Sequence, residues 1–265
     1  MTRHVLDEIV ARKRARLAEA REPDAAERAT PRWSGSIVER LRRANGAPLR
    51  LIAEIKRRSP SAGALSTALS PAERAAIYAR EGAAAISVLT DEDFFDGSFT
   101  HLASVAAGVD APALCKDFVL ATSQLDAAKA AGAAMVLLIV RLLDDAALRD
   151  LVAHARALGV EPFVEVTSDD ELSRALSAGA SIVGVNARDL DTLVVDRARA
   201  AQLLAQIPPR CVAVHLSGLS SPRDLAELSP RADAALLGEA LMREDDPTSL
   251  LRELVAAAGG PWRAA

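Results

Sequence analysis

The sequence predicts an α/β protein with the fold of a (β/α)8 TIM barrel and an N-terminal helical extension. Eight short apolar runs typical of buried strands recur over roughly 215 residues, with alanine-rich helical patterns between them. Several of these helical patterns end at a glycine shortly before the next strand. An open doubly wound sheet is disfavoured, because no Gly-x-Gly-x-x-Gly sequence follows the first strand. We therefore expect one domain over residues 1–265, with residues 1–47 as the extension and residues 48–265 as the barrel.

The extension lies outside the repeating pattern and predicts two helices. One face of the first helix is apolar, and its other faces carry Arg, Lys and Glu; the apolar positions are Val5, Leu6, Ile9, Val10 and Leu17. A break over residues 23–34 follows, and Ser36 can cap a second, short helix that ends near Gly46. We expect the two helices to form a lid or plug on the barrel, mainly through ordinary packing.

The first strand of the barrel, predicted from Leu51 to Lys56, carries charge on one face. Ala53 and Ile55 continue an apolar face, whereas Glu54 and Lys56 share the opposite face. A strand covered on both sides belongs in a parallel sheet or barrel, where a buried Glu and Lys need a partner or a function.

Seven further strands follow in order: Ala85 to Leu89, Ala113 to Lys116, Met135 to Val140, Pro162 to Val166, Ile182 to Asn186, Val212 to Leu216 and Ala234 to Leu237. Capping boxes at Ser70 and Ser168 and a proline at Pro222 mark the starts of helices. The expected helix ends are Gly82, Gly132, Gly159 and Gly179.

Composition argues against several classes of protein. The chain has 32 Lys and Arg against 36 Asp and Glu, a net charge of −4, and only 3% aromatic residues, so we expect no nucleic-acid partner. No apolar run approaches the roughly 18 residues of a membrane helix, so we expect no membrane partner. Cys115 and Cys211 lie in apolar runs and are expected to be buried free thiols in the cytoplasm. The histidines lack metal-ligand spacing, and we expect no metal.

If the fold is a barrel, its functional residues lie at the carboxyl ends of the strands. Strand periodicity places Lys116 on the face of Leu114, and Glu165 on the face of Phe163. The polar positions at these strand ends are Glu54, Lys56, Lys116, Glu165, Asn186, Arg188, Ser217 and Glu239. Two Lys, two Glu, an Asn and an Arg converging on one rim favour an active site over a structural layer of salt bridges.

Several motifs occur in order along nearly the whole chain. They are Val5-Leu6-Asp7-x-Ile9-Val10-x-x-Lys13, Glu54-x-Lys56-x-x-Ser59-Pro60-Ser61, Ser87-Val88-Leu89-Thr90, Phe95-Asp96-Gly97-Ser98, Lys116-Asp117-Phe118, Val164-Glu165-Val166, Asn186-x-Arg188-Asp189-Leu190, Ser217-Gly218 and Gly238-Glu239-Ala240-Leu241-Met242-Arg243. Each motif is weak alone, but the ordered set resembles the indole-3-glycerol phosphate synthase family.

The resemblance implies that the enzyme closes 1-(2-carboxyphenylamino)-1-deoxyribulose 5-phosphate to indole-3-glycerol phosphate, with loss of carbon dioxide and water, in tryptophan biosynthesis. It implies a phosphorylated small-molecule substrate and no organic cofactor or metal. The resemblance implies that Lys116 is the general acid at the substrate carbonyl. It also implies that Glu165 acts as a base in the final dehydration, with Lys56 or Glu54 assisting. We expect a monomer or a weak homodimer.

The remaining site residues follow from the same resemblance. Asn186 and Arg188 are expected to hold substrate hydroxyls and to brace Glu165. An apolar slot for the anthranilate ring is expected from Phe95, Phe118, Leu137 and Leu237. The phosphate is expected on the loops after the seventh and eighth strands, at Ser217, Gly218 and Gly238, with Ser59 reaching over from the first loop. Glu239, at the end of the eighth strand, is also expected to bind the substrate.

The sequence also departs from the family pattern. A glutamate usually precedes the Ser-Gly after the seventh strand, but this chain has Leu216, which faces inward with Val212 and Val214. Losing one such contact to the substrate commonly costs about 1 to 3 kcal/mol. The lysine that usually follows Ser-Pro-Ser is Ala62. These changes indicate a slower synthase or a paralogue that acts on a modified substrate.

Two other classes remain open. One is a related barrel enzyme such as a phosphosugar isomerase. Phosphoribosylanthranilate isomerase would need a Cys and an Asp as its acid-base pair, but Cys115 is predicted to face away from the barrel interior. A noncatalytic phosphate-ligand binder is favoured by Leu216 and opposed by the retention of both lysines and both glutamates.

Overall fold

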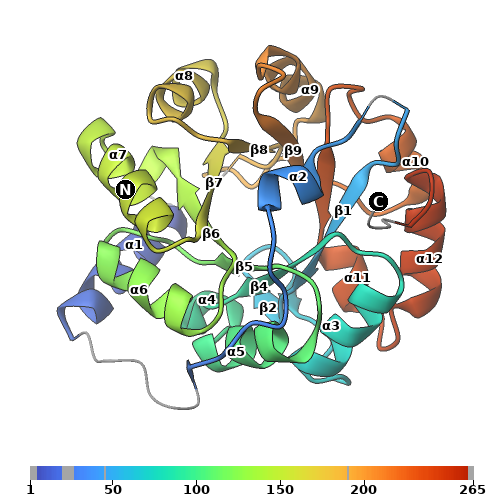
Figure 1. Ribbon diagram of the computed structural model, residues 1–265, viewed down its shortest axis with the longest axis horizontal. Helices are drawn as coiled ribbons and strands as arrows, with labels where there is room; N and C mark the ends of the chain where they lie inside the picture. The colour runs from blue at the N-terminus through green and yellow to red at the C-terminus, as the bar shows by residue number, and fades with distance from the viewer. Residues whose placement is uncertain (1–4, 20–26, 45, 190, 262–265) are drawn as a thin grey trace.

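Eight parallel strands close into a barrel surrounded by helices in the computed structural model, which describes residues 5–19, 27–44, 46–189 and 191–261 (Figure 1). Around the ring the strands follow their order in the chain. They are β1 (Arg50–Ile55), β4 (Ala85–Leu89), β5 (Ala113–Lys116), β6 (Met135–Ile139), β7 (Glu161–Val166), β8 (Ile182–Asn186), β9 (Val212–Leu216) and β10 (Ala234–Leu237). The predicted (β/α)8 fold is confirmed, and every predicted strand boundary lies within one residue of the observed one.

Helices follow each strand and cover the outside of the barrel (Figure 1). The main ones are α3 (Pro71–Arg80), α5 (Phe99–Gly108), α6 (Thr122–Ala130), α7 (Asp145–Ala157), α8 (Asp169–Ser177), α9 (Arg197–Gln206), α10 (Pro222–Ala226) and α12 (Thr248–Ala257). Two short helices, α4 (Glu92–Phe95) and α11 (Glu239–Arg243), lie in the loops after β4 and β10. The loop after β1 contains a small antiparallel pair, β2 (Arg58–Ser59) with β3 (Gly63–Ala64).

The helix boundaries follow the predicted signals with one exception. The four glycines predicted to end helices all adopt positive φ. Ser70 and Glu73 form the predicted capping box of α3. Ser168 caps α8 as predicted, because its Oγ accepts from Glu171 N at 3.2 Å, but the second half of the predicted box is wrong: the Glu171 carboxylate accepts from Thr167 N at 2.6 Å instead of from Ser168 N.

Two apolar layers account for the packing, one inside the barrel and one between the strands and the helices. Ile52, Leu114 and Phe163 belong to the inner layer, whereas Ala53 and Cys115 belong to the outer layer. Cys115 therefore faces away from the barrel interior, as predicted. Because strand residues alternate between the two layers, inward-facing positions near the strand ends open toward the carboxyl end of the barrel.

The N-terminal extension covers both ends of the barrel. Helix α1 (Val5–Ala18) places Leu6 and Ile9 over the carboxyl end, whereas α2 (Ile37–Leu41) lies at the amino end. There Arg40 Nε donates to Ala84 O at 2.6 Å, just before β4. The lid and the plug are thus two separate helices, which lie apart in Figure 1. Residues 20–26 of the predicted break lie outside the described residues, as does Leu190 of the Asn186 motif.

None of the described helices combines the length and the apolar character needed to cross a membrane.

Candidate active site

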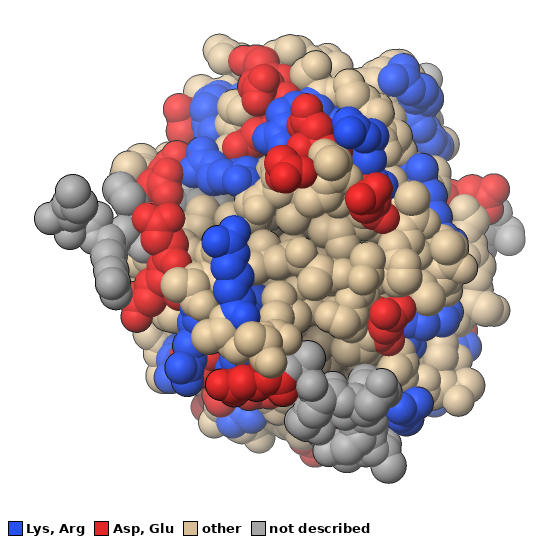
Figure 2. All heavy atoms as spheres, turned by 90° about the vertical axis from the view of Figure 1, so that its left-hand side faces the viewer, with Lys and Arg blue, Asp and Glu red and all other residues tan. Residues whose placement is uncertain are grey.

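A cavity of about 680 Å³ opens at the carboxyl ends of the strands. Figure 2 views the molecule from the side on which α1 lies in Figure 1, and charged side chains gather there in groups around a largely uncharged centre. All of the predicted site residues except Leu237 line this cavity: Glu54, Lys56, Ser59, Phe95, Lys116, Phe118, Leu137, Glu165, Asn186, Arg188, Leu216, Ser217, Gly218, Gly238 and Glu239. The sequence therefore located the cavity, although lining it does not by itself assign a role.

Glu54 and Lys56 form an ion pair on the inner face of β1. Lys56 Nζ lies 3.0 Å from Glu54 Oε1, and Ser87 Oγ donates to Glu54 Oε2 at 3.4 Å. Burial alone would raise the pKa of Glu54, but the charges of Lys56 and Lys116 and these hydrogen bonds outweigh burial and hold the pKa below its usual value. Glu54 is thus a fixed negative charge between two lysines.

Glu165 lies at the centre of a second polar group. Lys116 Nζ is 3.5 Å from Glu165 Oε2, and Asn186 Nδ2 donates to Glu165 Oε1 at 2.9 Å. Oε2 is buried and has no hydrogen-bond partner among the described residues. One carboxylate oxygen is therefore fixed by an amide, while the other is available to accept a proton from a bound molecule.

Arg188 braces this group differently from the prediction. Its backbone N donates to Asn186 Oδ1 at 3.0 Å, which orients the amide toward Glu165. Its guanidinium donates instead to Leu193 O at 3.1 Å. The expected brace is thus made by the main chain, and the side chain stabilises the loop after β8.

An apolar slot adjoins the charged groups. The rings of Phe95 and Phe118 have centroids 5.9 Å apart and are tilted by 37°. Leu137 lines the same cavity from β6. The predicted wall at Leu237 is wrong by one residue: Leu237 packs in the layer between strands and helices, and its neighbour Leu236 faces the cavity. This follows from the register, which pairs inward-facing Ile52 with Leu236.

The loops after β9 and β10 form the opposite end of the cavity. Ser217 and Gly218 adopt positive φ values of 67° and 74°, so the chain turns directly after β9, and both residues line the cavity. A Cβ on Gly238 would lie 2.5 Å from Glu54 Oε1, so only glycine lets this backbone approach the carboxylate. Glu239 forms an ion pair with Arg243 at 2.8 Å. Hydroxyls and close backbone at this end suit a phosphate.

Two basic residues in the loop after β1 contact other groups. Arg57 Nε pairs with Asp96 at 3.1 Å, and Arg58 Nη2 donates to Asp93 O at 2.5 Å. Ser59 Oγ accepts from Ala62 N at 3.1 Å, which fixes the turn that follows β2.

Comparison with known proteins identifies the family. Residues 6–254 match the family model described as indole-3-glycerol phosphate synthase. Indole-3-glycerol phosphate synthase 1 of Streptomyces coelicolor is 45% identical over 265 residues, which cover 97% of each chain. The corresponding synthase of Kineococcus radiotolerans is 43% identical over 265 residues, again covering 97% of each chain. The chain belongs to the indole-3-glycerol phosphate synthase family.

The enzyme is therefore a carboxy-lyase of tryptophan biosynthesis, and its substrate is a phosphorylated small molecule. Solved structures agree on the fold. The structure named "Native KDPGal structure" aligns with a TM-score of 0.57 and 20% identity, covering 79% of this chain and 94% of that one. A thiamine phosphate pyrophosphorylase from Pyrococcus furiosus aligns with a TM-score of 0.58 and 18% identity, covering 80% and 96%. At such identities the likeness shows the fold alone.

The position at which the family resemblance leads us to expect a glutamate lies inside the cavity. Leu216 is 2% exposed and lines the cavity next to Ser217, as the sequence predicted. The inner wall there is hydrocarbon, since Leu236 of the neighbouring strand pairs with Leu216 and also lines the cavity.

Sequence reasoning missed the contribution of α1. Val5, Leu6 and Ile9 line the cavity, so the helix is part of its wall. Lys13 was assigned to a polar outer face but is buried between Asp91 and Asp117. Its position one helical turn after Ile9, on the same face, was the available signal.

Among the described residues, no three His, Cys, Asp or Glu side chains gather as metal ligands.

Proposed function

We propose that Lys116 and Glu165 carry out the proton transfers of indole-3-glycerol phosphate formation, with Glu54, Lys56 and Asn186 assisting. The observation that carries this proposal is the 3.5 Å approach of Lys116 Nζ to Glu165 Oε2 within one cavity. The two groups are close enough to act on one bound molecule, and each comes from a different strand.

Lys116 acts first in the proposed sequence. The ring carbon that bears the carboxylate attacks the substrate ketone, a carbon–carbon bond forms, and the ammonium of Lys116 gives a proton to the carbonyl oxygen. The ring carbon is then tetrahedral, and the bond to the carboxylate breaks as carbon dioxide leaves. Its electron pair returns to the ring. Lys56, held by Glu54 at 3.0 Å, pairs with the carboxylate or the neighbouring hydroxyls before this step.

Glu165 completes the reaction. Its free oxygen removes the proton whose loss forms the indole double bond, while the ammonium of Lys56 gives a proton to the new hydroxyl, which leaves as water. Asn186 keeps the carboxylate oriented through its 2.9 Å hydrogen bond.

The substrate lies along the cavity in this proposal. Phe95, Phe118, Leu137 and Leu236 enclose the aromatic ring, and Arg188 lines the cavity near the hydroxyls. The phosphate binds at the opposite end of the cavity, at Ser59, Ser217, Gly218 and Gly238.

Two measurements test the function directly. The purified enzyme should convert 1-(2-carboxyphenylamino)-1-deoxyribulose 5-phosphate to a product with indole absorbance, and the coding sequence should restore growth of a tryptophan auxotroph that lacks this step. Binding without turnover would support a noncatalytic phosphate-ligand binder instead.

The apolar wall at Leu216 favours a second candidate, a synthase that prefers a modified substrate. Substrates substituted on the aromatic ring or lacking a ribulose hydroxyl should then exceed the unmodified substrate in kcat/KM. Equal or lower values would reject this candidate.

The enzyme is proposed to be a single domain that acts as a monomer or weak homodimer in the cytoplasm. In support, Val194 is the sole large hydrophobic residue that is exposed in the described part of the chain. Cys115 and Cys211 are buried free thiols, consistent with a reducing compartment. Light scattering after size exclusion should give one subunit mass at micromolar concentration, and thermal unfolding should show one transition.

A further inference from the structure

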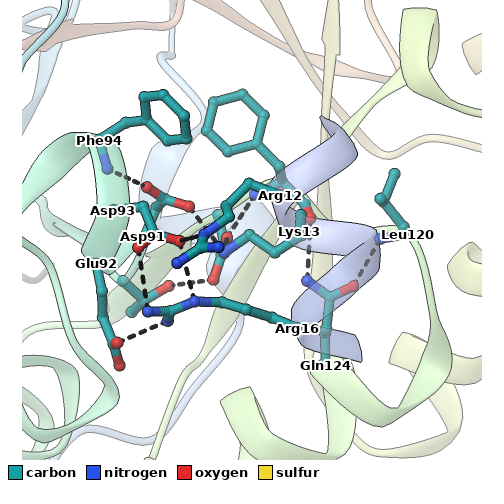
Figure 3. Close-up of polar contacts among 12 residues, drawn as sticks. Arg12, Lys13, Arg16, Asp91, Glu92, Asp93, Phe94, Leu120 and Gln124 are labelled. Atoms are coloured by element: carbon teal, nitrogen blue, oxygen red, sulfur yellow. Dashed lines mark hydrogen bonds and ion pairs between the residues drawn. The ribbon is translucent and has the colours of Figure 1, made fainter. Parts of the chain in front are cut away.

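Lys13 of α1 is a buried cation outside the proton-transfer group. Its side-chain ammonium lies 2.9 Å from Asp91 Oδ2 (Figure 3) and 2.7 Å from Asp117 Oδ1, and the residue is 8% exposed. The three residues are far apart in the chain, so this contact exists only in the folded barrel. It joins α1 to the ends of β4 and β5.

Asp91 controls the position of the first aromatic residue of the slot. Its Oδ1 accepts from Phe94 N at 2.9 Å and so caps α4, the short helix that ends at Phe95. Its backbone O accepts from Gly97 N at 2.9 Å, which closes the loop around α4. A shift of Asp91 would therefore move Phe95.

Asp117 controls the position of the proposed acid. It follows Lys116 directly, its Oδ1 accepts from Phe118 N at 2.7 Å, and its Oδ2 accepts from Thr90 Oγ1 at 2.8 Å. This carboxylate fixes the main chain between Lys116 and the second aromatic residue. A shift of Asp117 would therefore move both.

Lys13 is needed because the two carboxylates are buried, Asp91 at 3% and Asp117 at 4% exposure. Burial lowers the pKa of Lys13, but the two aspartates outweigh burial and raise it, so the ammonium stays charged. Without it, two neighbouring carboxylates would remain in a site with little water. Repulsion would then separate the loops that carry Lys116 and Phe95.

The other ion pairs of α1 cannot replace Lys13. Arg12 Nε reaches Asp93 at 3.1 Å, and Arg16 Nη1 reaches Glu92 at 2.6 Å (Figure 3). Both arginine side chains are more exposed than that of Lys13, and exposed pairs contribute little.

We propose that Lys13 is a positioning residue for the reaction: it holds Lys116 and the Phe95–Phe118 slot in place through Asp117 and Asp91. Helix α1 then contributes to the chemical step as well as to the cavity wall. This inference rests on the proposed role of Lys116.

The test compares Lys13→Met with Lys13→Arg and with the double variant Arg12→Met/Arg16→Met. We expect Lys13→Met to lower kcat by about 10- to 100-fold, since small displacements of reacting groups have effects of this size. Lys13→Arg restores a cation. On a logarithmic scale, its kcat should therefore lie at least a third of the way from the value of Lys13→Met to that of the parent. The double variant should stay within about twofold of the parent enzyme in kcat.

Circular dichroism and thermal melting measure the folded fraction of each variant, and rates are normalised to it. A normalised kcat for Lys13→Met within twofold of the parent value overturns the proposal. An equal decrease of kcat in Lys13→Met and Lys13→Arg also overturns it. If Lys13→Met does not fold, Asp91→Asn replaces it. That variant keeps the Asp117 pair and should raise KM by about 3- to 10-fold through Phe95, with a smaller change in kcat; an unchanged KM overturns the proposal.

Lys116→Met, measured alongside, separates this inference from the proposed function. Normal turnover by Lys116→Met would reject the assignment of Lys116 as the acid. If Lys116→Met loses turnover but Lys13→Met keeps the parent kcat, only the role of Lys13 is rejected.

Discussion

Lys116 Nζ lies 3.5 Å from Glu165 Oε2, although the two residues belong to strands that are separated by β6 in the barrel. The gap exceeds the usual length of a charge-assisted hydrogen bond, and Oε2 has no hydrogen-bond partner among the described side chains and backbone. The two groups thus face each other without a close bond. Atoms of a bound substrate can therefore form hydrogen bonds with both Lys116 Nζ and Glu165 Oε2.

Removing either group should therefore affect chemistry more than stability. We expect Lys116→Met and Glu165→Gln each to lower kcat by about 10²- to 10⁴-fold, with melting temperatures near that of the parent. Single-turnover measurements of indole absorbance check the rate. Lys129→Met, which removes an exposed lysine on α6, is the matched control and should behave like the parent. More than a tenth of the parent activity in Lys116→Met would contradict its assignment as the acid.

Glu54 predicts a defined response to acid. Its pKa is lowered in the folded state, because Lys56, Lys116 and the hydrogen bonds to the carboxylate outweigh the effect of burial. A lowered folded-state pKa contributes stability that is present above the unfolded value near 4.5 and is lost as pH falls through the folded value. The free energy of unfolding of Glu54→Gln should therefore depend less on pH below about 4.5 than that of the parent.

Urea unfolding measured from neutral pH down to about pH 3 checks this expectation. Glu253→Gln, which removes an exposed carboxylate on α12 away from the cavity, is the control. Parallel pH curves for the parent and Glu54→Gln would contradict the lowered pKa.

Gly238 makes the position of Glu54 sensitive to one methyl group. A Cβ at residue 238 would lie 2.5 Å from Glu54 Oε1, too close for any real contact, so Gly238→Ala must displace the carboxylate or the loop after β10. We expect kcat/KM to fall by about 10- to 100-fold. Gly108→Ala is the matched control, because its Cβ would meet only Ala72 Cβ at 4.0 Å. Steady-state kinetics of both variants check the prediction, and equal behaviour would show that the loop adapts freely.

The barrel could be predicted because its signals are local. Strand runs, capping residues such as Ser70 and glycines such as Gly82 each act within a few residues, and together they define the eight repeats. The errors arose where a choice depended on packing. Leu236 and Leu237 are equally apolar, and only the register with β1 decides which faces the cavity. At Ser168 the sequence pattern fits a capping box, but Thr167 binds the Glu171 carboxylate instead.

The role of α1 could not be predicted from local signals. Lys13 on a helix next to arginines is typical of a solvated face, and its partners Asp91 and Asp117 belong to loops more than 70 residues further along the chain. Burial of a lysine is justified only by such partners. The polar residues of the cavity were different, because strand periodicity and the position at a strand end together placed Lys116 and Glu165 on one rim.

Leu216 predicts a gain of function. If the enzyme acts on the unmodified family substrate, Leu216→Glu returns a carboxylate to the inner wall and should raise kcat/KM by about 5- to 100-fold, matching about 1 to 3 kcal/mol for a substrate contact. Leu216→Gln, of similar size without charge, is the control and should give a smaller gain. Steady-state kinetics on the unmodified substrate check this. Loss of activity in Leu216→Glu together with a preference for less polar substrates would instead favour the modified-substrate candidate.

Arg74 links the stability of the barrel to the proposed phosphate end of the cavity. The residue is 1% exposed, and its guanidinium donates to Leu241 O and Glu244 O, each at 3.0 Å, at the end of α11. Arg74→Met would leave these carbonyls without a donor, which should cost about 1 to 3 kcal/mol in the free energy of unfolding. Because α11 follows Gly238 directly, its displacement should also weaken phosphate binding.

We therefore expect Arg74→Met to raise KM and the inhibition constant of inorganic phosphate by about 5- to 20-fold, with a smaller change in kcat. Arg80→Met, at an exposed position on the same helix, is the matched control and should leave both constants within about twofold of the parent values. Urea unfolding and phosphate inhibition measured on the same preparations separate the two effects. A variant that loses stability but keeps its affinity for phosphate would show that α11 does not position the phosphate, and the anion would then have to bind at the loop after β9 alone.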